Sequence, residues 1–552
     1  MTADLIVIGT IYDGINSPKP PRMLAVKDGI FCYVGSEEQF NDYLGKHTKV
    51  IRLSQGCLLP GLFEGHAHVT SGIQLIRGIE LNNLNSPSEY VGAISTYIKL
   101  HPEEEFISGR GFINSHFGSE GPTAKLLDGI TKEKYILLNS EDCHSSWVNT
   151  KVLEAAGITE DTEEVENGVI VRYENSKLPT GWLKEKEMHH VAKLLPKTSL
   201  AEYKKIILSY QEIALSHGLT AVYEPIMNDT DDCAIRVQAY HELDLENKLV
   251  MQFRVGITLN PHDDCTLLNE IAKWRQQTMG SHFEIIGIKV FLDGVVEGHT
   301  AFLREPYADQ PGDCGHNMWD QTNLNELFII AAGLDLSVHV HVIGDAAIDS
   351  ALQAFEKALQ TVGKKDLRNC ITHLQIMQED QFKGFQEMDL IAVTNPFWHC
   401  KNPAYYDELE VPYLGLLRAE KEYPMQSFFR RDIIVTQASD WPVSHSFHPF
   451  LGMEIAVTRR EKGNVMMEPL NPKEAVTIEQ MLKAITFNGA FQLKLEKVMG
   501  SIEIGKKANF IILDKDILAL PPEEISEVTV LRNYIDGKSI YENRNECKLA
   551  LS

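Results

Sequence analysis

The sequence predicts an α/β fold: a (β/α)8 TIM-type barrel with a small composite β-sandwich domain from both chain ends and an inserted subdomain. Three observations predict this arrangement. Eight short apolar runs alternate with helical stretches in the middle of the chain, as in βα units that build a parallel barrel. Strand-like runs separated by Gly, Asp and Asn turns occupy both ends. The gap between the first two apolar runs is too long for one crossover helix, which indicates an insertion.

Length, composition and charge restrict the class of protein. The chain has 552 residues, with 52 Lys and Arg against 77 Asp and Glu, a formal net charge of −25. At roughly 100 to 200 residues per domain, it holds more than one domain. Its 43% apolar and 23% charged residues are typical of globular proteins and exclude disordered, collagen-like and disulfide-rich classes. The acidity and the lack of a Lys/Arg run predict that nucleic acid is not a partner.

The cysteines and the amino-terminal sequence indicate a cytoplasmic protein. Nine cysteines are scattered without a CxxC pair or a regular framework, as expected for reduced thiols. The first residues, MTADLIVIG, lack the basic region and the apolar core of a signal peptide. No run approaches the roughly 18 apolar residues of a membrane span. We therefore expect a cytoplasmic location and no membrane partner.

The two chain ends, residues 1–58 and 498–552, are predicted to form one small β domain. Their strand-like runs lie at 3–14, 22–35, 48–61, 500–516 and 528–543. The runs of the amino-terminal end have the pattern of a small antiparallel sheet. Neither end has enough residues for a good core of its own, so the two are expected to pair.

The middle of the chain, residues 59–497, is predicted to form the barrel. Its eight candidate strands are 58–69, 218–225, 251–259, 283–294, 336–345, 368–376, 390–396 and 432–442. About 150 residues separate the first strand from the second, far more than a βα connection needs. Residues from about 75 to 200 are therefore expected to form an inserted subdomain over the barrel mouth.

Polar residues at the ends of these apolar runs are the candidates for chemistry, because active sites of such barrels lie at the carboxyl ends of the strands. His66 and His68 are two apart on one strand, so both imidazoles point to the same side, as one metal ion requires. Four more candidates end other strands: Lys289, His341, His373 and Asp440. One histidine in an apolar strand is usually a core residue, but the joint occurrence indicates a metal site. Nitrogen and oxygen ligands without thiolates favour zinc, or manganese, iron or cobalt.

Lys289 lies within the continuous apolar strand IIGIKVFLD. Burial of a lysine is costly unless the amine is neutral, paired or modified, because burial lowers its pKa. A neutral amine can act as a base or a nucleophile. The alternative is a lysine whose chain reaches from the strand end to solvent.

Several segments together resemble one known family. PGLFEGHAHV (60–69) resembles the strand-1 signature Pro-Gly-x-x-Asp-x-His-x-His of the metal-dependent amidohydrolase superfamily. The rest resembles its YtcJ-like, N-substituted formamide deformylase-like branch, amidohydrolase family 3, over nearly the whole chain. The segments are DCHSSWVNTKVLEAAGI (142–158), LPTGWLKEKE (178–187), GLTAVYEP (218–225), IKVFLDGVVEGHTAFLREPY (288–307), HVIGDAAIDSAL (341–352), ITHLQI (371–376), ASDWPV (438–443), ITFNGA (485–490) and GSIEIGKKANFIILD (500–514).

The resemblance implies a binuclear metal site. Lys289 would carry a carbamate derived from CO2 and bridge two divalent ions, most simply Zn²⁺, with Mn²⁺, Fe²⁺ or Co²⁺ as alternatives. His66 and His68 would hold the first ion together with Asp440, and His341 and His373 the second. This agrees with the residues themselves, because carbamate formation needs an unprotonated lysine and two dications need compensating negative charge.

The same resemblance implies the reaction. Metal-activated hydroxide would cleave an amide-type C–N bond of a small molecule, such as an N-acyl or N-formyl amine or a related cyclic amide, with Asp440 as the general base. A homodimer is expected by family analogy and base rates.

The chain departs from the family pattern at two positions of interest. Glu64 replaces the usual aspartate before HxH and is expected to orient a ligand imidazole. His299 stands where many relatives have arginine, which predicts a different substrate preference. His339 lies two residues before His341 but matches no family ligand, so we expect it to be a core residue.

Other side chains are candidates for a substrate pocket, since such pockets combine apolar walls with a few polar groups. They are Asp142, His144 and Trp182 from the insertion, and Tyr223, Phe397, Trp398 and Trp441 at or near strand ends. The alternative is that the tryptophans pack the insertion onto the barrel.

Three other functions stay open at this point. The same site could hydrolyse a carboxyl ester, a lactone or a phosphotriester, which a substrate panel separates. A deaminase would have a mononuclear site and an unmodified Lys289. A non-catalytic scaffold relative should have lost ligands, whereas all six candidate ligands are present.

Overall fold

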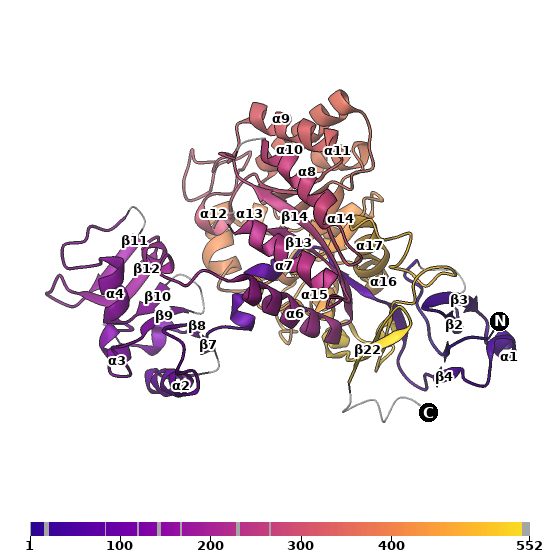
Figure 1. Ribbon diagram of the computed structural model, residues 1–552. Helices are drawn as coiled ribbons and strands as arrows, with labels where there is room; N and C mark the ends of the chain where they lie inside the picture. The colour runs from indigo at the N-terminus through magenta and orange to yellow at the C-terminus, as the bar shows by residue number, and fades with distance from the viewer. Residues whose placement is uncertain are drawn as a thin grey trace. The chain divides into compact units, whose positions relative to one another are not determined.

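The computed structural model contains the predicted barrel. It describes residues 2–15, 21–82, 84–118, 121–140, 145–165, 168–227, 232–263 and 266–543. One sheet has eight strands in the order β6-β13-β14-β15-β16-β17-β18-β19, and each strand is parallel to its neighbours in this order. Figure 1 labels two of these strands, β13 and β14. The strands are β6 (Leu62–Glu64), β13 (Leu219–Ile226), β14 (Gln252–Leu259), β15 (Phe283–Phe291), β16 (Ser337–Val342), β17 (Cys370–His373), β18 (Ile391–Thr394) and β19 (Val435–Gln437). The prediction of a TIM-type barrel from eight apolar runs is confirmed.

Backbone hydrogen bonds join the first strand to the last. Gly65 N donates to Gln437 O at 2.9 Å, Asp440 N to His66 O at 2.8 Å, and His68 N to Trp441 O at 2.7 Å. A Cβ on Gly65 would lie 2.7 Å from Gln437 O, so glycine permits this close approach. The closure therefore places the HxH segment directly beside Asp440.

Helices follow the strands, as a parallel sheet requires. Around β13 to β17 they are α6 (Leu200–Ser216), α7 (Cys233–Leu245), α8 (Thr266–Thr278), α9 (Gln321–Gly333), α10 (Asp345–Val362) and α11 (Phe382–Glu387). The later ones are α12 (Val411–Leu414), α13 (Leu416–Ala419), α14 (Met425–Phe429), α15 (Pro449–Thr458), α16 (Ile478–Lys483) and α17 (Gly489–Gln492). In α10, Ala347, Ala351, Ala354 and Ala358 are buried, the spacing of one helical face packed on the core.

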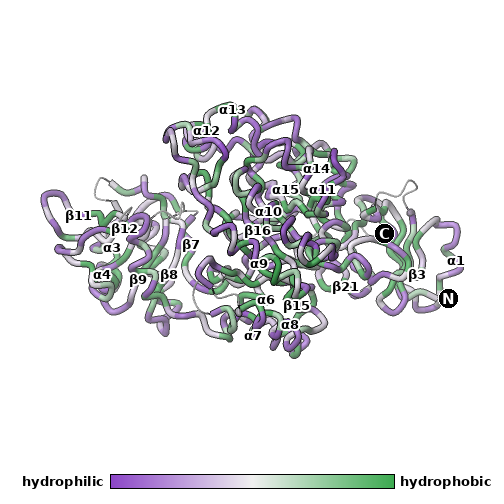
Figure 2. Tube along the Cα trace, turned by 90° about the horizontal axis from the view of Figure 1, so that it is seen from above, coloured by the Kyte–Doolittle hydropathy of each residue, from purple (hydrophilic) through white to green (hydrophobic). Residues whose placement is uncertain are grey.

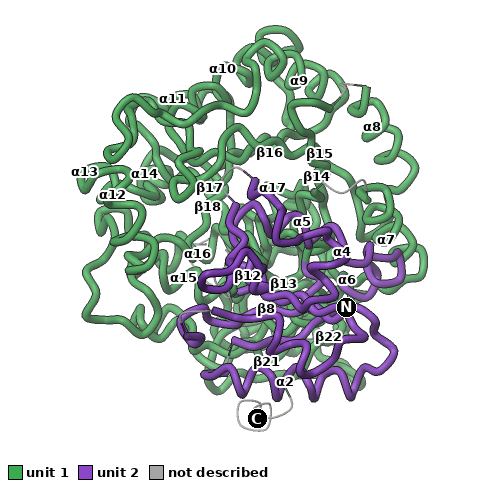
Figure 3. The backbone as a smooth tube through the Cα atoms, turned by 90° about the vertical axis from the view of Figure 1, so that its left-hand side faces the viewer, with its two compact units in different colours: residues 1–71, 207–552 green, residues 72–206 purple. Residues whose placement is uncertain are grey.

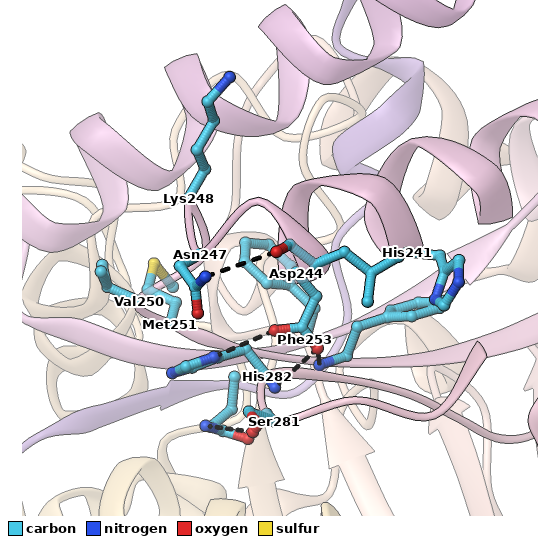
Figure 4. Close-up of polar contacts among 12 residues, drawn as sticks. His241, Asp244, Asn247, Lys248, Val250, Met251, Phe253, Ser281 and His282 are labelled. Atoms are coloured by element: carbon cyan, nitrogen blue, oxygen red, sulfur yellow. Dashed lines mark hydrogen bonds and ion pairs between the residues drawn. The ribbon is translucent and has the colours of Figure 1, made fainter.

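At the amino-terminal ends of β14 and β15, polar side chains bond to the backbone (Figure 4). Asp244, in the last turn of α7, accepts hydrogen bonds from His282 N at 3.0 Å and Phe283 N at 3.2 Å. It also lies 3.2 Å from the Nδ1 of His282. Gln211 of α6 similarly accepts from Val250 N and Met251 N. Gln211 thus anchors the start of β14, and Asp244 anchors the start of β15, the strand that carries Lys289.

The first predicted strand, 58–69, divides into two short strands. β5 (Leu58–Pro60) pairs with β20 (Phe510–Leu513), whereas β6 pairs with β13. The change of pairing partner occurs between Gly61 and Leu62. Gly61 N still donates to Asn509 O, just before β20, whereas Leu62 N donates to Gly218 O, just before β13. One continuous segment thus belongs to both the terminal sheets and the barrel.

The chain ends form two four-stranded sheets with a shared apolar core. One sheet has the order β3-β2-β1-β4 and the other β22-β21-β20-β5. The strands not yet given are β1 (Leu5–Ile8), β2 (Met23–Lys27), β3 (Ile30–Gly35), β4 (Lys49–Arg52), β21 (Val530–Ile535) and β22 (Lys538–Glu542). Phe31, Phe510 and Tyr534 pack in one core cluster with Leu5 and Val7. The expectation of a purely antiparallel amino-terminal sheet was wrong, because β1 pairs with β4 in parallel.

The chain divides into two compact units, residues 1–71 with 207–552 and residues 72–206 (Figure 3). The second unit has a six-stranded sheet in the order β11-β12-β10-β9-β8-β7. Its elements are β7 (Ile79–Glu80), α2 (Pro87–Leu100), β8 (Phe106–Phe112), α3 (Ala124–Asp128), β9 (Tyr135–Ser140), β10 (Ser145–Val148), α4 (Thr150–Ala156), β11 (Gly168–Arg172), β12 (Pro179–Glu185) and α5 (Met188–Ala192). Trp147 is buried in its core against Phe112 and Phe117. Helix α6 contains the boundary at 206/207.

Hydrophobic and hydrophilic residues are interspersed along the whole trace (Figure 2). Within the part of the chain that the structure describes, no helix has both the length and the apolar character needed to cross a membrane.

Candidate metal centre

Three possible ligand atoms converge where β6 and β19 end. His66 Nε2 and His68 Nε2 are 3.3 Å apart, and Asp440 Oδ1 lies 3.1 Å from the first and 3.3 Å from the second. All three residues are at least nine-tenths buried. Two imidazole nitrogens and a carboxylate oxygen gathered so closely form a donor set suited to a divalent cation.

The remaining ring nitrogens indicate which atoms are available as ligands. His68 Nδ1 is 3.1 Å from Pro225 O, and a carbonyl oxygen only accepts, so this nitrogen carries the proton. The Nε2 of His68 is therefore left with its lone pair. His66 Nδ1 is 2.9 Å from His339 Nε2. In His68 the hydrogen bond on one side of the ring therefore fixes the nitrogen offered on the other side.

His341 and His373 lie next to this group. Their rings are 4.5 Å apart, edge to face, and the rings of His66 and His373 are 5.5 Å apart. The Nδ1 of His373 is 3.0 Å from Asn395 Oδ1. The Nε2 of His341 is 3.1 Å from Gly294 O, which leaves Nδ1 with the lone pair.

Lys289 is completely buried, and its Nζ has no hydrogen-bond partner in the described part of the chain. Burial lowers its pKa to about 7, although the charge of Asp440 acts in the opposite direction. A large fraction of the amine is therefore neutral near neutral pH. An unpartnered buried amine is costly in a folded protein unless something occupies the space beside it.

Burial also decides the charge of the candidate ligand imidazoles. It lowers the pKa of His66 and of His373 well below the usual range and that of His341 to about 3, with Lys289 contributing in each case. These rings are therefore neutral and have a lone pair. For Asp440, burial alone would raise the pKa, but the neighbouring groups His68, His373 and Lys289 lower it overall. The carboxylate is therefore ionised at neutral pH.

Two of these residues have left-handed backbone. The φ angle is +57° at Asp440 and +76° at His373. Side chains other than glycine rarely adopt such angles, and those that do cluster at functional sites.

Glu64 acts on the backbone of the site. Its Oε1 accepts from His66 N at 3.0 Å and from Ser439 N at 2.9 Å, so one carboxylate connects the ends of the first and last strands. Burial raises its pKa to about 7 despite these two hydrogen bonds. The imidazole of His66 has a different partner, His339.

Sequence reasoning missed three residues of the site. His339 was expected to be an ordinary core residue, yet it contacts His66. Asn395 contacts His373. Buried Asp293 accepts from Phe302 N, Ile343 N and Gly344 N and so connects the segments after β15 and β16. All three lie on or just after barrel strands, a signal that would have found them.

The predicted pocket residues have varied positions. Trp398 stacks on His373 at 5.2 Å and donates to Ser444 Oγ, and Tyr223 is buried and stacks on His339. Trp441 contacts the stacked rings of Tyr210 and Phe447, and Phe397 lies close to Gly452. His299 pairs with Asp309 and contacts the rings of Tyr307 and Tyr413.

Trp182, from the insertion, lies on β12 of the 72–206 unit beside Lys184. Asp142 and His144 lie outside the described residues.

Comparison with known protein families identifies one match. The model described as "Amidohydrolase family" matches residues 49–541, a range that includes every residue of the site described above.

Three curated relatives align along most of the chain. "Protein LONG AFTER FAR-RED 3" from Arabidopsis thaliana is 26% identical, covering 98% of this chain and 92% of its own. "Putative amidohydrolase YtcJ" from Bacillus subtilis is 25% identical, covering 97% and 98%. "N-substituted formamide deformylase" from Arthrobacter pascens is 24% identical, covering 94% and 95%.

A solved structure is similar in fold. It is described as an uncharacterized metal-dependent hydrolase from Pyrococcus horikoshii OT3, has a TM-score of 0.74 and 23% identity, and the match covers 94% of this chain and 99% of that one.

Proposed function

The chain belongs to the amidohydrolase family, and from this premise we propose that it is a metal-dependent hydrolase that cleaves an amide-type C–N bond of a small molecule. One observation carries the proposal. His66 Nε2, His68 Nε2 and Asp440 Oδ1 lie within 3.3 Å of one another in a buried site. Such a set of lone pairs is unfavourable without a cation between them.

The donor set supports two divalent ions. His66, His68 and Asp440 would hold one ion, and His341 and His373 the other. Lys289, neutral and unpartnered, could react with CO2 and supply a carbamate to both. When bound, such ions lower the pKa of water from 15.7 towards ~7 and polarise a carbonyl oxygen.

The protein's own residues then perform the proton transfers. Asp440, ionised at neutral pH, accepts a proton from the attacking water on a carboxylate oxygen as the new C–O bond forms. It returns that proton to the amide nitrogen as the C–N bond breaks, so that an amine and a carboxylic acid leave. Glu64 keeps the backbone of the first and last strands in place during these steps.

The substrate class is proposed from the relatives. One of them is described as an N-substituted formamide deformylase and another as a putative amidohydrolase. Trp398, stacked on the ligand His373, offers an apolar ring beside the site. N-formyl and N-acyl amines with an apolar substituent are therefore the first compounds to test, with cyclic amides next.

Metal content and substrate hydrolysis test the proposal together. We expect about two divalent ions per chain by elemental analysis, and a mass increase on Lys289 equal to one CO2 by native mass spectrometry. In a panel of N-formyl amines, N-acyl amines, esters, lactones and phosphotriesters, the amides should turn over fastest. Faster cleavage of esters or phosphotriesters would mean that the enzyme hydrolyses those bonds rather than amides. Release of ammonia by a protein that holds one metal ion would indicate a deaminase. No metal after supplementation would favour a scaffold protein.

Lys289→Ala should lose the second ion, because the side chain proposed to connect the two ions is removed. Elemental analysis should then give about one metal per chain and little activity. A short carboxylic acid such as acetate or propionate should restore part of the metal content and part of the activity, since it supplies the missing carboxylate. Retention of two ions and full activity without added acid would exclude the carbamate.

A further inference from the structure

On its Nδ1 side, the ring of His66 contacts a second buried histidine rather than a carbonyl or a carboxylate. Its Nδ1 lies 2.9 Å from Nε2 of His339, and the two ring centroids are 4.9 Å apart. His339 is 2% exposed and occupies the middle of β16, beside Lys289 of β15 in the sheet register. Ordinary core packing would not require two imidazoles to meet through their nitrogens.

The positions of the ring protons decide which of the two histidines donates this hydrogen bond. The Nε2 of His66 faces His68 Nε2 and Asp440 Oδ1, so a metal ligand there needs its lone pair on Nε2 and its proton on Nδ1. That proton is donated to His339 Nε2. The proton of neutral His339 must then reside on its Nδ1, which has no hydrogen-bond partner in the described part of the chain. A buried donor without a hydrogen-bond partner is unfavourable, so the arrangement is retained at the expense of stability.

The neighbouring strands fix the ring of His339. The ring of Tyr223 on β13 stacks on it with centroids 4.5 Å apart and planes 14° apart. The hydroxyl of Tyr223 fills the position next to Gly256 on β14, where an added Cβ would lie 2.1 Å from it. Three strands thus contribute to one ring orientation, and the ring has little freedom to turn away from His66.

We propose that His339 is a positioning residue that holds His66 in the tautomer and orientation needed to bind metal. This rests on the proposed function, since it assigns a role to a neighbour of a metal ligand. His339 would act only through His66. Losing the acceptor would let the His66 proton move to Nε2, the atom that should bind the ion.

The test measures metal binding by the full chain without reference to a substrate. His339→Phe keeps a ring against Tyr223 but removes the acceptor, whereas His339→Gln places an amide oxygen near the former Nε2. His399→Phe is the matched control, because His399 is also buried and stacks on a tyrosine, Tyr423, at 4.6 Å. Zn²⁺ affinity is measured by competition with a chromogenic chelator, and the ligand field by the absorption spectrum of the Co²⁺ form.

His339→Phe should weaken Zn²⁺ binding by about 10- to 100-fold and change the Co²⁺ spectrum. His339→Gln should recover most of the affinity, and His399→Phe should match the wild type. Wild-type affinity in His339→Phe, or equal losses in the Phe and Gln variants, would overturn the positioning role while leaving the proposed function intact. A wild-type chain that binds no metal would overturn both.

A measurement on the wild type keeps the inference testable if His339→Phe does not fold. In the metal-free protein with ¹⁵N-labelled histidine, proton–nitrogen correlation spectra report which ring nitrogen carries the proton. We expect protonated Nδ1 in both His66 and His339. A proton on Nε2 of His66 would overturn the proposal.

Discussion

At the scale of single residues, Asp440 combines two tasks that are normally separate. Its Oδ1 completes the group with His66 and His68, while its backbone N donates to His66 O across the barrel closure. A left-handed φ of +57° lets the side chain turn towards both histidines. One residue therefore contributes both to the candidate ligand group and to the closure of the barrel.

Asp440→Asn should separate metal binding from proton transfer. The amide has the same shape and keeps an oxygen ligand, but it is too weak a base to accept the proton of water. We expect metal content to remain near the wild-type value and turnover to fall by about 10²- to 10⁴-fold. Elemental analysis and kcat on the best panel substrate check this. Unchanged turnover would exclude Asp440 as the base.

At the scale of elements, the end of α6 meets the start of α15. His217 follows α6 and His448 precedes α15, and their rings are 4.7 Å apart beside Phe447. The Nδ1 of each ring has no hydrogen-bond partner among the described residues. Burial lowers the pKa of both imidazoles to about 4, and for His448 the charge of His217 adds to the effect.

These pKa values predict a dependence of stability on pH. Between about pH 6.5 and pH 4 the unfolded chain binds protons at His217 and His448 that the folded chain does not. The free energy of unfolding therefore falls as the pH is lowered through that range. His217→Gln should make the slope shallower by up to about 1.4 kcal/mol per pH unit. Urea unfolding at several pH values measures this slope. An identical slope in the variant would contradict the assignment of the pH dependence to His217.

The link between α7 and the start of β15 makes a second prediction at this scale (Figure 4). Asp244→Ala removes the acceptor for His282 N and Phe283 N, and each unpaired donor costs about 1–3 kcal/mol. We expect a loss of stability of a few kcal/mol, with metal content of the folded fraction unchanged. Glu387→Ala is the control, since Glu387 forms an exposed pair with Lys383, a type of contact worth about 0–1 kcal/mol.

At the scale of the whole molecule, the two chain ends and the barrel share one strand segment. β5 belongs to the terminal sheets and β6 to the barrel, with only Gly61 between them. His66 lies two residues after the end of β6. Packing of the terminal sheets is therefore connected through the chain to the candidate metal centre.

Phe510→Ala tests this connection. Phe510 is buried and stacks on Tyr534 at 4.4 Å, so the cavity should cost about 3–5 kcal/mol. Hydrogen exchange should accelerate in both terminal sheets and in β6, since β5 pairs directly with β20. Ile540→Ala is the control, because Ile540 lies on the outer strand β22 with its side chain exposed. It should change neither the stability nor the hydrogen exchange of β6. Faster exchange limited to the terminal sheets would show that the two parts unfold independently.

The local sequence pattern was enough to predict much of this fold. Apolar runs ended by His66, His341, His373 and Asp440 predicted the barrel strands and the residues at their carboxyl ends, because strand periodicity and burial are properties of short segments. The parallel pairing of β1 with β4 was not predictable in this way, since partner choice depends on residues more than forty positions apart.

What the sequence by itself determined is the set of chemical groups: imidazoles, a carboxylate and one lysine at or near the ends of apolar strands. Only the tertiary structure decided how they are used, through which ring nitrogen faces the site, the bond from His66 to His339, and the attachment of Glu64 to two backbone amides. The physical reason is that hydrogen bonds have short range and strict direction. Their partners come from strands far apart in the chain, so they exist only once the barrel has closed.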